Sequence, residues 1–220
     1  MRCLLLVVLY HALFAGGLVY AHFALHGVWS PLHAALAVFE TLNAWICVCE
    51  IALLVHSRTI SEVHKDSEAK LGVGRLPPVF LFEEVTLAQA LSLRYWSEMW
   101  STYAALDPSY AEPSSFGFCV DVGNGVSTIV PTVLFAVGMT WPIMPARLLG
   151  MMGLVVHYQE FYGTCIYFFS YFFNQRYKRT TKAHVLGIVV PANAIWMVFP
   201  SLGMWASAQL ILSGDFTLFR

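Results

Sequence analysis

Charged side chains are scarce in this sequence. Only 11% of its 220 residues are Asp, Glu, Lys or Arg, whereas 58% are hydrophobic. A soluble domain is about a quarter charged, so this chain has too little polar surface to cover a globule in water. Its formal net charge is −1, which gives no basic surface for a nucleic-acid partner. The sequence therefore predicts a polytopic membrane protein with one domain over residues 1–220.

The sequence also lacks the residue spacing of metal, heme and nucleotide sites. Cys47 and Cys49 lie about 200° apart around a helix and cannot share a metal from one face. We interpret all the cysteines as buried free thiols. His157 is the one histidine deep in an apolar stretch, which disfavours a heme held by two histidines. The stretch LGVGRL follows no strand and predicts no nucleotide loop. We expect no metal and no cofactor. The five cysteines are Cys3, Cys47, Cys49, Cys119 and Cys165.

Five apolar stretches are long enough to cross a bilayer, which takes about 20 helical residues. The predicted fold is all-α, a five-transmembrane-helix bundle with an intramembrane cavity. The first stretch also fits a signal peptide, because Arg2 precedes it and small residues end it. Its apolar run is longer than a usual signal-peptide core, which favours a retained helix. The five stretches are Leu4–Phe23, Leu36–His56, Phe116–Thr140, Leu148–Phe173 and Val185–Leu212.

Basic residues gather in two loops, one between the second and third stretches and one between the fourth and fifth. The positive-inside rule then places the N-terminus and both loops in the cytosol and the C-terminus outside. Residues 57–98 form the first cytosolic loop. Within it, we predict that Pro77–Trp96 is an interfacial helix, because its charged residues oppose a crossing. The preceding stretch, His64–Pro78, has the composition of a linker.

Acidic side chains occur inside or beside the apolar stretches, where ionisable groups are costly and mark candidate functional sites. Glu50 has no charged residue within six positions on either side. Asp121 and Asn124 are three residues apart and share a helix face. Glu160 lies near the middle of the fourth stretch. Glu40 lies near the start of the second stretch and can reach the membrane interface.

Two interpretations of these acids stay open. Each could be a structural polar contact between helices, worth about 1 kcal/mol. Alternatively, apolar surroundings favour the protonated form of a carboxyl, which can then act as a general acid. Two carboxyls in unlike environments can divide acid and base roles.

Aromatic residues make up 15% of the chain and extend into the apolar stretches. Trp196 and the run YGTCIYFFSYFF lie inside them and can line a cavity. Asn193 lies three residues before Trp196 and therefore on the same helix face. Aromatic faces stabilise cations, by about 2 kcal/mol or more when desolvated. Acids and aromatics together suit protonation of an olefin through a carbocation, and they equally suit binding of an amine or a sterol.

From Ser97 onward the residues resemble the emopamil-binding protein family of the EXPERA superfamily. This family contains sterol Δ8–Δ7 isomerases, and the superfamily also contains proteins of the sigma-2 receptor type. The resemblance covers residues 97–205, about half the chain. The matching residues, in chain order, are Trp100, Tyr103, Asp107, Tyr110, Asp121, Tyr162, Gly163, Tyr167, Phe168, Asn193, Ala194, Trp196 and Pro200.

The second stretch departs from the isomerase pattern. Isomerases carry His-x-x-x-Glu there, whereas this chain has Ile46 four residues before Glu50. The Cys49–Glu50 pair is similar to the binding-protein branch. Asp121 and Asn124 stand where the isomerases have Glu and Thr. The resemblance therefore leaves an enzyme and a binder both open.

The resemblance implies a set of roles for the site residues. In an enzyme, Glu50 and Asp121 would be the catalytic, proton-handling pair and Trp196 would face a carbocation. Asn193 would hydrogen-bond a carboxyl, for which Asp121 is the best candidate. Further substrate-binding residues would be Tyr103, Tyr110, Asn124, Tyr162 and Glu160.

The expected function is isomerisation, or a related cyclisation, of a sterol or terpenoid olefin without a cofactor. The alternative is a non-catalytic sterol or lipid binder, or an accessory subunit of a membrane complex. The expected partners are a sterol or terpenoid and membrane lipid, with no nucleic acid and with a homodimer left open. The resemblance implies the endoplasmic reticulum.

Overall fold

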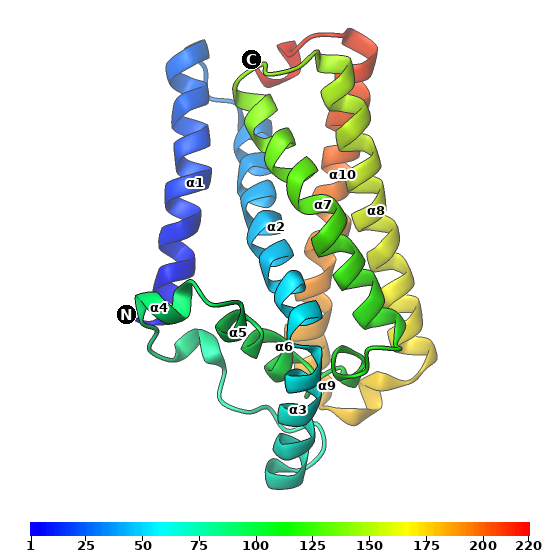
Figure 1. The fold of residues 1–220 in the computed structure, drawn as a ribbon. Coiled ribbons are helices and arrows are strands. Elements are labelled where there is room, and N and C mark those ends of the chain that lie inside the picture. Colours follow the sequence, from blue (N-terminus) through cyan, green and yellow to red (C-terminus); the bar gives the residue numbers. More distant parts are fainter.

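The computed structural model describes residues 1–220 and contains only helices and their connections, which confirms the all-α prediction (Figure 1). Five helices are long. They run roughly along one direction, and each of them contains most of one predicted apolar stretch. The long helices are α1 Cys3–His26, α2 Pro31–Val55, α7 Phe116–Thr140, α8 Ala146–Phe173 and α10 Val190–Ser213.

Four segments are long and apolar enough to cross a membrane. They are Cys3–His26, Pro31–Val55, Phe116–Thr140 and Lys182–Ser213. The last comprises α9 (Lys182–His184), the π-helical turn η4 (Val185–Val189) and α10. α8 has 28 residues but is not among the four, because polar residues such as His157, Gln159 and Glu160 reduce its mean hydropathy. These four segments are consistent with an integral membrane protein.

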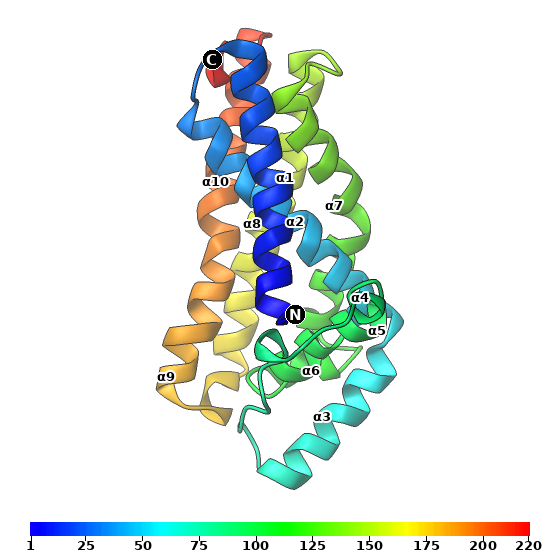
Figure 2. The same cartoon turned by 90° about the vertical axis from the view of Figure 1, so that its left-hand side faces the viewer.

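Short elements close the end of the bundle that holds the N-terminus (Figure 2). The same end carries both basic loops, and the C-terminus lies at the opposite end, as the predicted topology requires. The short elements at this end are α3 Ser57–Leu71, η1 Phe80–Phe82, α4 Leu87–Ala90, α5 Leu93–Trp96, α6 Glu98–Tyr103, η2 Pro108–Ala111 and η3 Arg176–Arg179. A further turn, η5 Thr217–Phe219, follows α10 at the opposite end.

Local sequence signals set several helix ends. Ser30 precedes α2 and accepts a hydrogen bond from the His33 backbone N–H. Ser115 does the same for the Phe118 N–H at the start of α7. These caps satisfy backbone donors that a helix leaves free at its N-terminus. Gly27 ends α1 with φ of 72°, a conformation that costs glycine little.

The segment predicted as one interfacial helix is divided instead. Pro77–Trp96 contains η1, α4 and α5, and Thr86 begins α4 through a reciprocal cap with Gln89. Between these elements, Glu83 and Val85 pair with residues 1–3 through backbone hydrogen bonds, including Cys3 N to Glu83 O at 2.9 Å. Because residues 83–85 are extended in order to make these bonds, the segment cannot form one continuous helix.

Two other predictions need correction. The stretch assigned to a linker is helical as far as Leu71, because α3 continues to that residue. The five cysteines are free, but only Cys3, Cys47 and Cys49 are buried, whereas Cys165 is half-buried and Cys119 is exposed. An apolar stretch does not specify which helix face is covered, so the burial of each thiol could not be derived from it.

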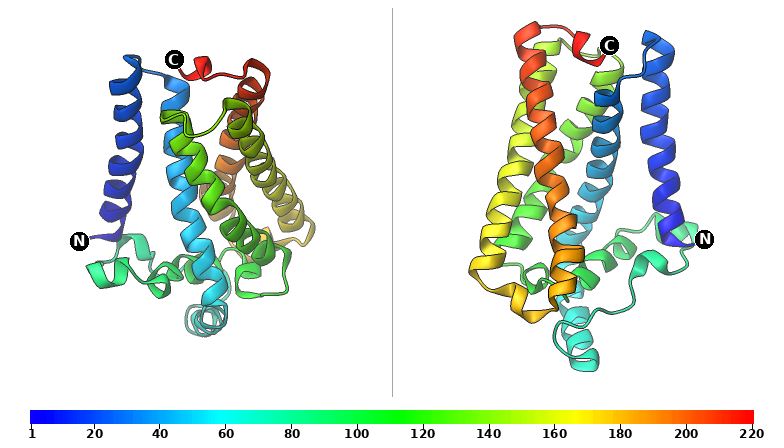
Figure 3. Two further views of the ribbon diagram at one scale, coloured as in Figure 1. Left: turned by 45° about the horizontal axis from the view of Figure 1, so that its top comes forward. Right: turned by 180° about the vertical axis from the view of Figure 1, so that it is seen from behind.

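Four long helices form the core of the bundle, and α1 stands at its edge beside α2 (Figures 1 and 3). Small residues bring α8 and α10 together. A Cβ atom at Gly150 would lie 2.6 Å from the Ser207 carbonyl oxygen, and one at Gly203 would overlap the His157 ring. Small residues allow such close approach in membrane helices, where packing rather than water drives association.

We predict that Gly150→Ala destabilises the bundle, because the added methyl group meets backbone rather than a flexible side chain. The expected loss is about 1–3 kcal/mol, seen as a lower unfolding temperature in detergent. Gly16→Ala is the matched control, since nothing lies within 4 Å of its Cβ position. Equal unfolding temperatures for the two variants would contradict this packing.

Candidate functional site

A pocket of about 270 Å³ lies among α2, α7, α8 and α10, with α6 and η2 at its base. Its volume is near the lower limit of small-molecule sites, which hold about 300–1,000 Å³. Eleven of its 19 lining residues are hydrophobic, and none is Lys or Arg. Eight of the predicted site residues line it: Glu50, Tyr103, Tyr110, Asp121, Asn124, Glu160, Asn193 and Trp196.

Glu50 on α2 is 4% exposed, and a hydrogen bond from a side chain on α7 positions its carboxyl. Asn124 Nδ2 donates to Glu50 Oε2 at 2.9 Å. Gly125, the next residue of α7, lies against the Glu50 Cβ and the Cys47 carbonyl, so a larger residue would separate the two helices. The carboxyl therefore has one oxygen fixed by a neutral donor.

Asp121 lies one turn before Asn124 on α7 and lines the same pocket as Glu50. The Tyr110 side chain lines this pocket as well. Two carboxyls from facing helices thus share one largely apolar cavity.

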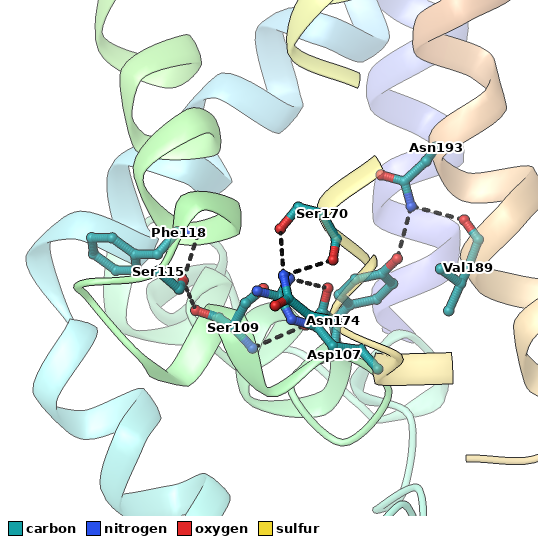
Figure 4. A network of polar contacts seen from close by, with 10 residues as sticks. Asp107, Ser109, Ser115, Phe118, Ser170, Asn174, Val189 and Asn193 are labelled. Carbon is teal, nitrogen blue, oxygen red and sulfur yellow. Dashed lines mark hydrogen bonds and ion pairs between the residues drawn. The ribbon is translucent and has the colours of Figure 1, made fainter. Parts of the chain in front are cut away.

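Asn193 has a different partner from the one predicted. Its Nδ2 donates to Tyr103 Oη and to the Val189 carbonyl, both at 2.8 Å (Figure 4). Asp121, the predicted partner, is not among the acceptors of this amide nitrogen. Tyr103, the last residue of α6, lines the pocket and accepts the bond that was expected at Asp121.

Aromatic rings form the base and one wall of the pocket. The Trp100 and Tyr110 rings stack with centroids 4.8 Å apart, and Tyr103 meets Tyr110 edge-on at 5.2 Å. Trp196 lines the wall on α10 and meets Phe39 edge-on at 6.1 Å. These rings can offer π-faces to a ligand in the pocket.

Tyr162 lies outside the pocket. Its side chain is 53% exposed and stacks on Tyr158, with centroids 5.8 Å apart. Each helical residue turns by about 100°, and the neighbouring Gly163 faces inward instead. Tyr167, one turn further along α8, provides the tyrosine that Tyr162 was expected to provide.

Asp107 of the family-like motif has a structural role. Its Oδ1 accepts from the Ser109 N–H at 3.0 Å and caps η2, and Arg176 Nη1 lies 3.5 Å from its Oδ2 (Figure 4). Ser115 then joins η2 to the start of α7 by donating to the Ser109 carbonyl. This network fixes the turn that carries Tyr110 below the pocket.

Glu160 lies at another part of the pocket wall, and Asn43 Nδ2 donates to its Oε1. Glu40, which lies close enough to the start of its stretch to reach the interface, is instead 1% exposed, and its Oε1 lies 2.8 Å from His157 Nε2. Sequence reasoning missed Asn43 and the Glu40–His157 pair. The available signal was the spacing of Glu40, Asn43 and Cys47 along one face of α2.

No protein-family model, no curated protein and no solved structure matches this chain.

Proposed function

We propose that this protein is an integral membrane isomerase, or a related cyclase, that acts on a sterol or terpenoid olefin. One observation carries the proposal: Glu50 on α2 and Asp121 on α7 line the same apolar pocket, beside the Trp196 ring. The resemblance of residues 97–205 to the emopamil-binding protein family supplies the substrate class.

The proposed reaction conserves protons. One carboxyl delivers its proton to an olefin carbon and leaves a carbocation on the neighbouring carbon. The other carboxylate removes a proton from an adjacent carbon, and the electron pair of that C–H bond becomes the new double bond. After the reaction, the first carboxyl is ionised and the second is protonated. The reaction consumes no proton and no electron, so it needs no cofactor.

The surroundings of the two carboxyls support this chemistry. Asn124 donates to Glu50 Oε2, which leaves the other oxygen of Glu50 for proton transfer. The Trp196 ring can stabilise a neighbouring cation by about 2 kcal/mol when water is excluded. Mostly hydrophobic lining limits capture of the carbocation by water.

We further propose that α8 crosses the membrane as a fifth span and that the pocket lies within the bilayer. α8 is 28 residues long, and its polar residues His157 and Glu160 are buried by neighbouring helices rather than presented to lipid. The basic loops would then face the cytosol. The endoplasmic reticulum follows from the family resemblance.

A second candidate function is a non-catalytic sterol or lipid binder, or an accessory subunit of a membrane complex. Ile46 favours it, because this residue lines the pocket at the position where the isomerases carry histidine. A binder would use the same apolar lining without the acid–base step.

Incorporation of deuterium from the solvent distinguishes the isomerase from the binder. We expect the purified protein to isomerise a Δ8-sterol, or a member of a terpenoid panel, in D₂O with uptake of deuterium measured by mass spectrometry. Glu50→Gln and Asp121→Asn should each lower turnover at least about 100-fold, because general acid–base groups contribute 10²–10⁴-fold. Glu62→Gln, which changes an exposed carboxyl on α3, is the control.

Absence of deuterium in every substrate would refute the isomerase. If sterols then bind with an affinity that Asp121→Asn weakens, the binder is the correct function.

Ile46→His provides a gain-of-function test. The substitution places an imidazole one helical turn before Glu50 and restores the isomerase pattern on α2. We expect faster turnover of Δ8-sterols than in the unchanged protein, measured as product formed per minute. Ile46→Gln is the matched control, since it adds a polar group that cannot exchange a proton near neutral pH. Equal rates for the two variants would contradict a catalytic role for this position.

A further inference from the structure

Two hydrogen bonds fix the orientation of the Asn193 amide. Its Nδ2 donates to the Val189 carbonyl and to Tyr103 Oη, each at 2.8 Å, which uses both hydrogens of the amide nitrogen. The Val189 carbonyl can only accept, so the atom beside it has to be the nitrogen, and the flipped amide is excluded. The amide oxygen, Oδ1, points away from Val189 (Figure 4).

This amide oxygen is accessible. Asn193 Oδ1 accepts no hydrogen bond from the protein, and it is not one of the polar atoms that the protein buries without a partner. An unpartnered atom outside that buried group has accessible surface. Because Asn193 lines the pocket, its Oδ1 is a hydrogen-bond acceptor for a ligand there.

Tyr103 supplies a donor beside this acceptor. Its Oη accepts the Asn193 N–H, and a phenol has one hydrogen of its own to donate. Tyr167, another tyrosine of the pocket lining, does not take that hydrogen, because its Oη is buried without a hydrogen-bond partner. Tyr103 is half-buried and lines the pocket, so its hydrogen is available to the same ligand.

An acceptor and a donor, joined by one hydrogen bond, are therefore offered together, and their chemistry selects among ligand groups. An alcohol hydroxyl satisfies both, since it donates its hydrogen and accepts another. A ketone can only accept, so it leaves Asn193 Oδ1 without a partner. An ammonium group can only donate, so it leaves the Tyr103 hydrogen without one. A hydrocarbon satisfies neither.

We infer that Tyr103 and Asn193 form a hydroxyl-binding subsite of the pocket and that its ligand is an alcohol. The inference rests on the proposed function in treating this pocket as the substrate site. It narrows the substrate class to olefinic sterols or terpenoids that carry a hydroxyl group. Tyr103 and Asn193 bind and orient this substrate, whereas Glu50 and Asp121 transfer its protons.

Two matched sets of ligands test the subsite. One set is a Δ8-sterol with a hydroxyl, a ketone or only hydrogens at the same ring carbon, and the other is a terpenoid alcohol with its ketone and its hydrocarbon. We expect one alcohol at least to bind at least about tenfold more tightly than its ketone and its hydrocarbon, because both of these leave a polar group of the site unpaired. Affinity would be measured in detergent by quenching of tryptophan fluorescence, since Trp100 and Trp196 line the pocket.

Three variants connect this preference to the subsite. Tyr103→Phe keeps the ring and removes the donor, and Asn193→Leu removes the acceptor. Each should lower the affinity for the alcohol about tenfold and leave the affinity for the hydrocarbon unchanged. Tyr167→Phe is the matched control and should keep the preference for the alcohol, because the hydroxyl that it removes has no access to the pocket. Gel filtration checks that each variant folds.

Three outcomes would overturn the inference: no binding of either alcohol, equal affinities within both sets, or a preference for the alcohol that Tyr103→Phe leaves unchanged. A preference for the alcohol in a protein that incorporates no deuterium would refute the proposed isomerase and leave the subsite intact. Conversely, turnover of the hydrocarbon as fast as the alcohol would refute the subsite and leave the isomerase intact.

Discussion

The structure depends on how carboxyl groups are accommodated inside an apolar helical bundle. Each of two pocket carboxyls accepts a hydrogen bond from an asparagine on a neighbouring helix: Glu50 from Asn124 and Glu160 from Asn43. Without such donors, each buried oxygen would cost about 1–3 kcal/mol or more. Each asparagine occupies one oxygen of its carboxyl, and Oε2 of Glu160 is buried without a hydrogen-bond partner. These contacts join α2 to α7 and α8.

Small residues make these polar contacts possible. Gly125 brings the α7 backbone against Glu50, and Gly203 brings α10 against His157. Asparagine and histidine side chains are short, so they bridge two helices only when the backbones approach closely. The close approach at Gly125 lies beside the pocket, because Glu50 and Asn124 line it. The rings of Tyr103 and Tyr110, from α6 and η2, form another part of the lining.

Hydropathy predicted most of the fold, because a long apolar run has few alternatives to a helix. The predicted bounds of α7 match the observed ones, Phe116–Thr140. Helical periodicity also placed Asn193 and Trp196 on one face correctly. It could not tell which helices face each other, so it missed Tyr103 as the partner of Asn193. The same limit explains the wrong prediction for Tyr162. Whether its side chain points into the bundle or outward depends on the rotation of α8 against its neighbours. Glu40 and His157 are 117 residues apart, and no local pattern predicts that they meet.

The contact between Glu50 on α2 and Asn124 on α7 underlies the account of the site, and oxidative cross-linking measures it directly. The cysteines Glu50→Cys and Asn124→Cys would be introduced into a chain whose five natural cysteines are replaced by alanine. Oxidation should join this pair readily, whereas Glu50→Cys with Ser127→Cys, whose side chain is exposed on α7, should stay unlinked. Equal cross-linking of both pairs, or none in the first, would contradict the contact between Glu50 and Asn124 on which the site depends.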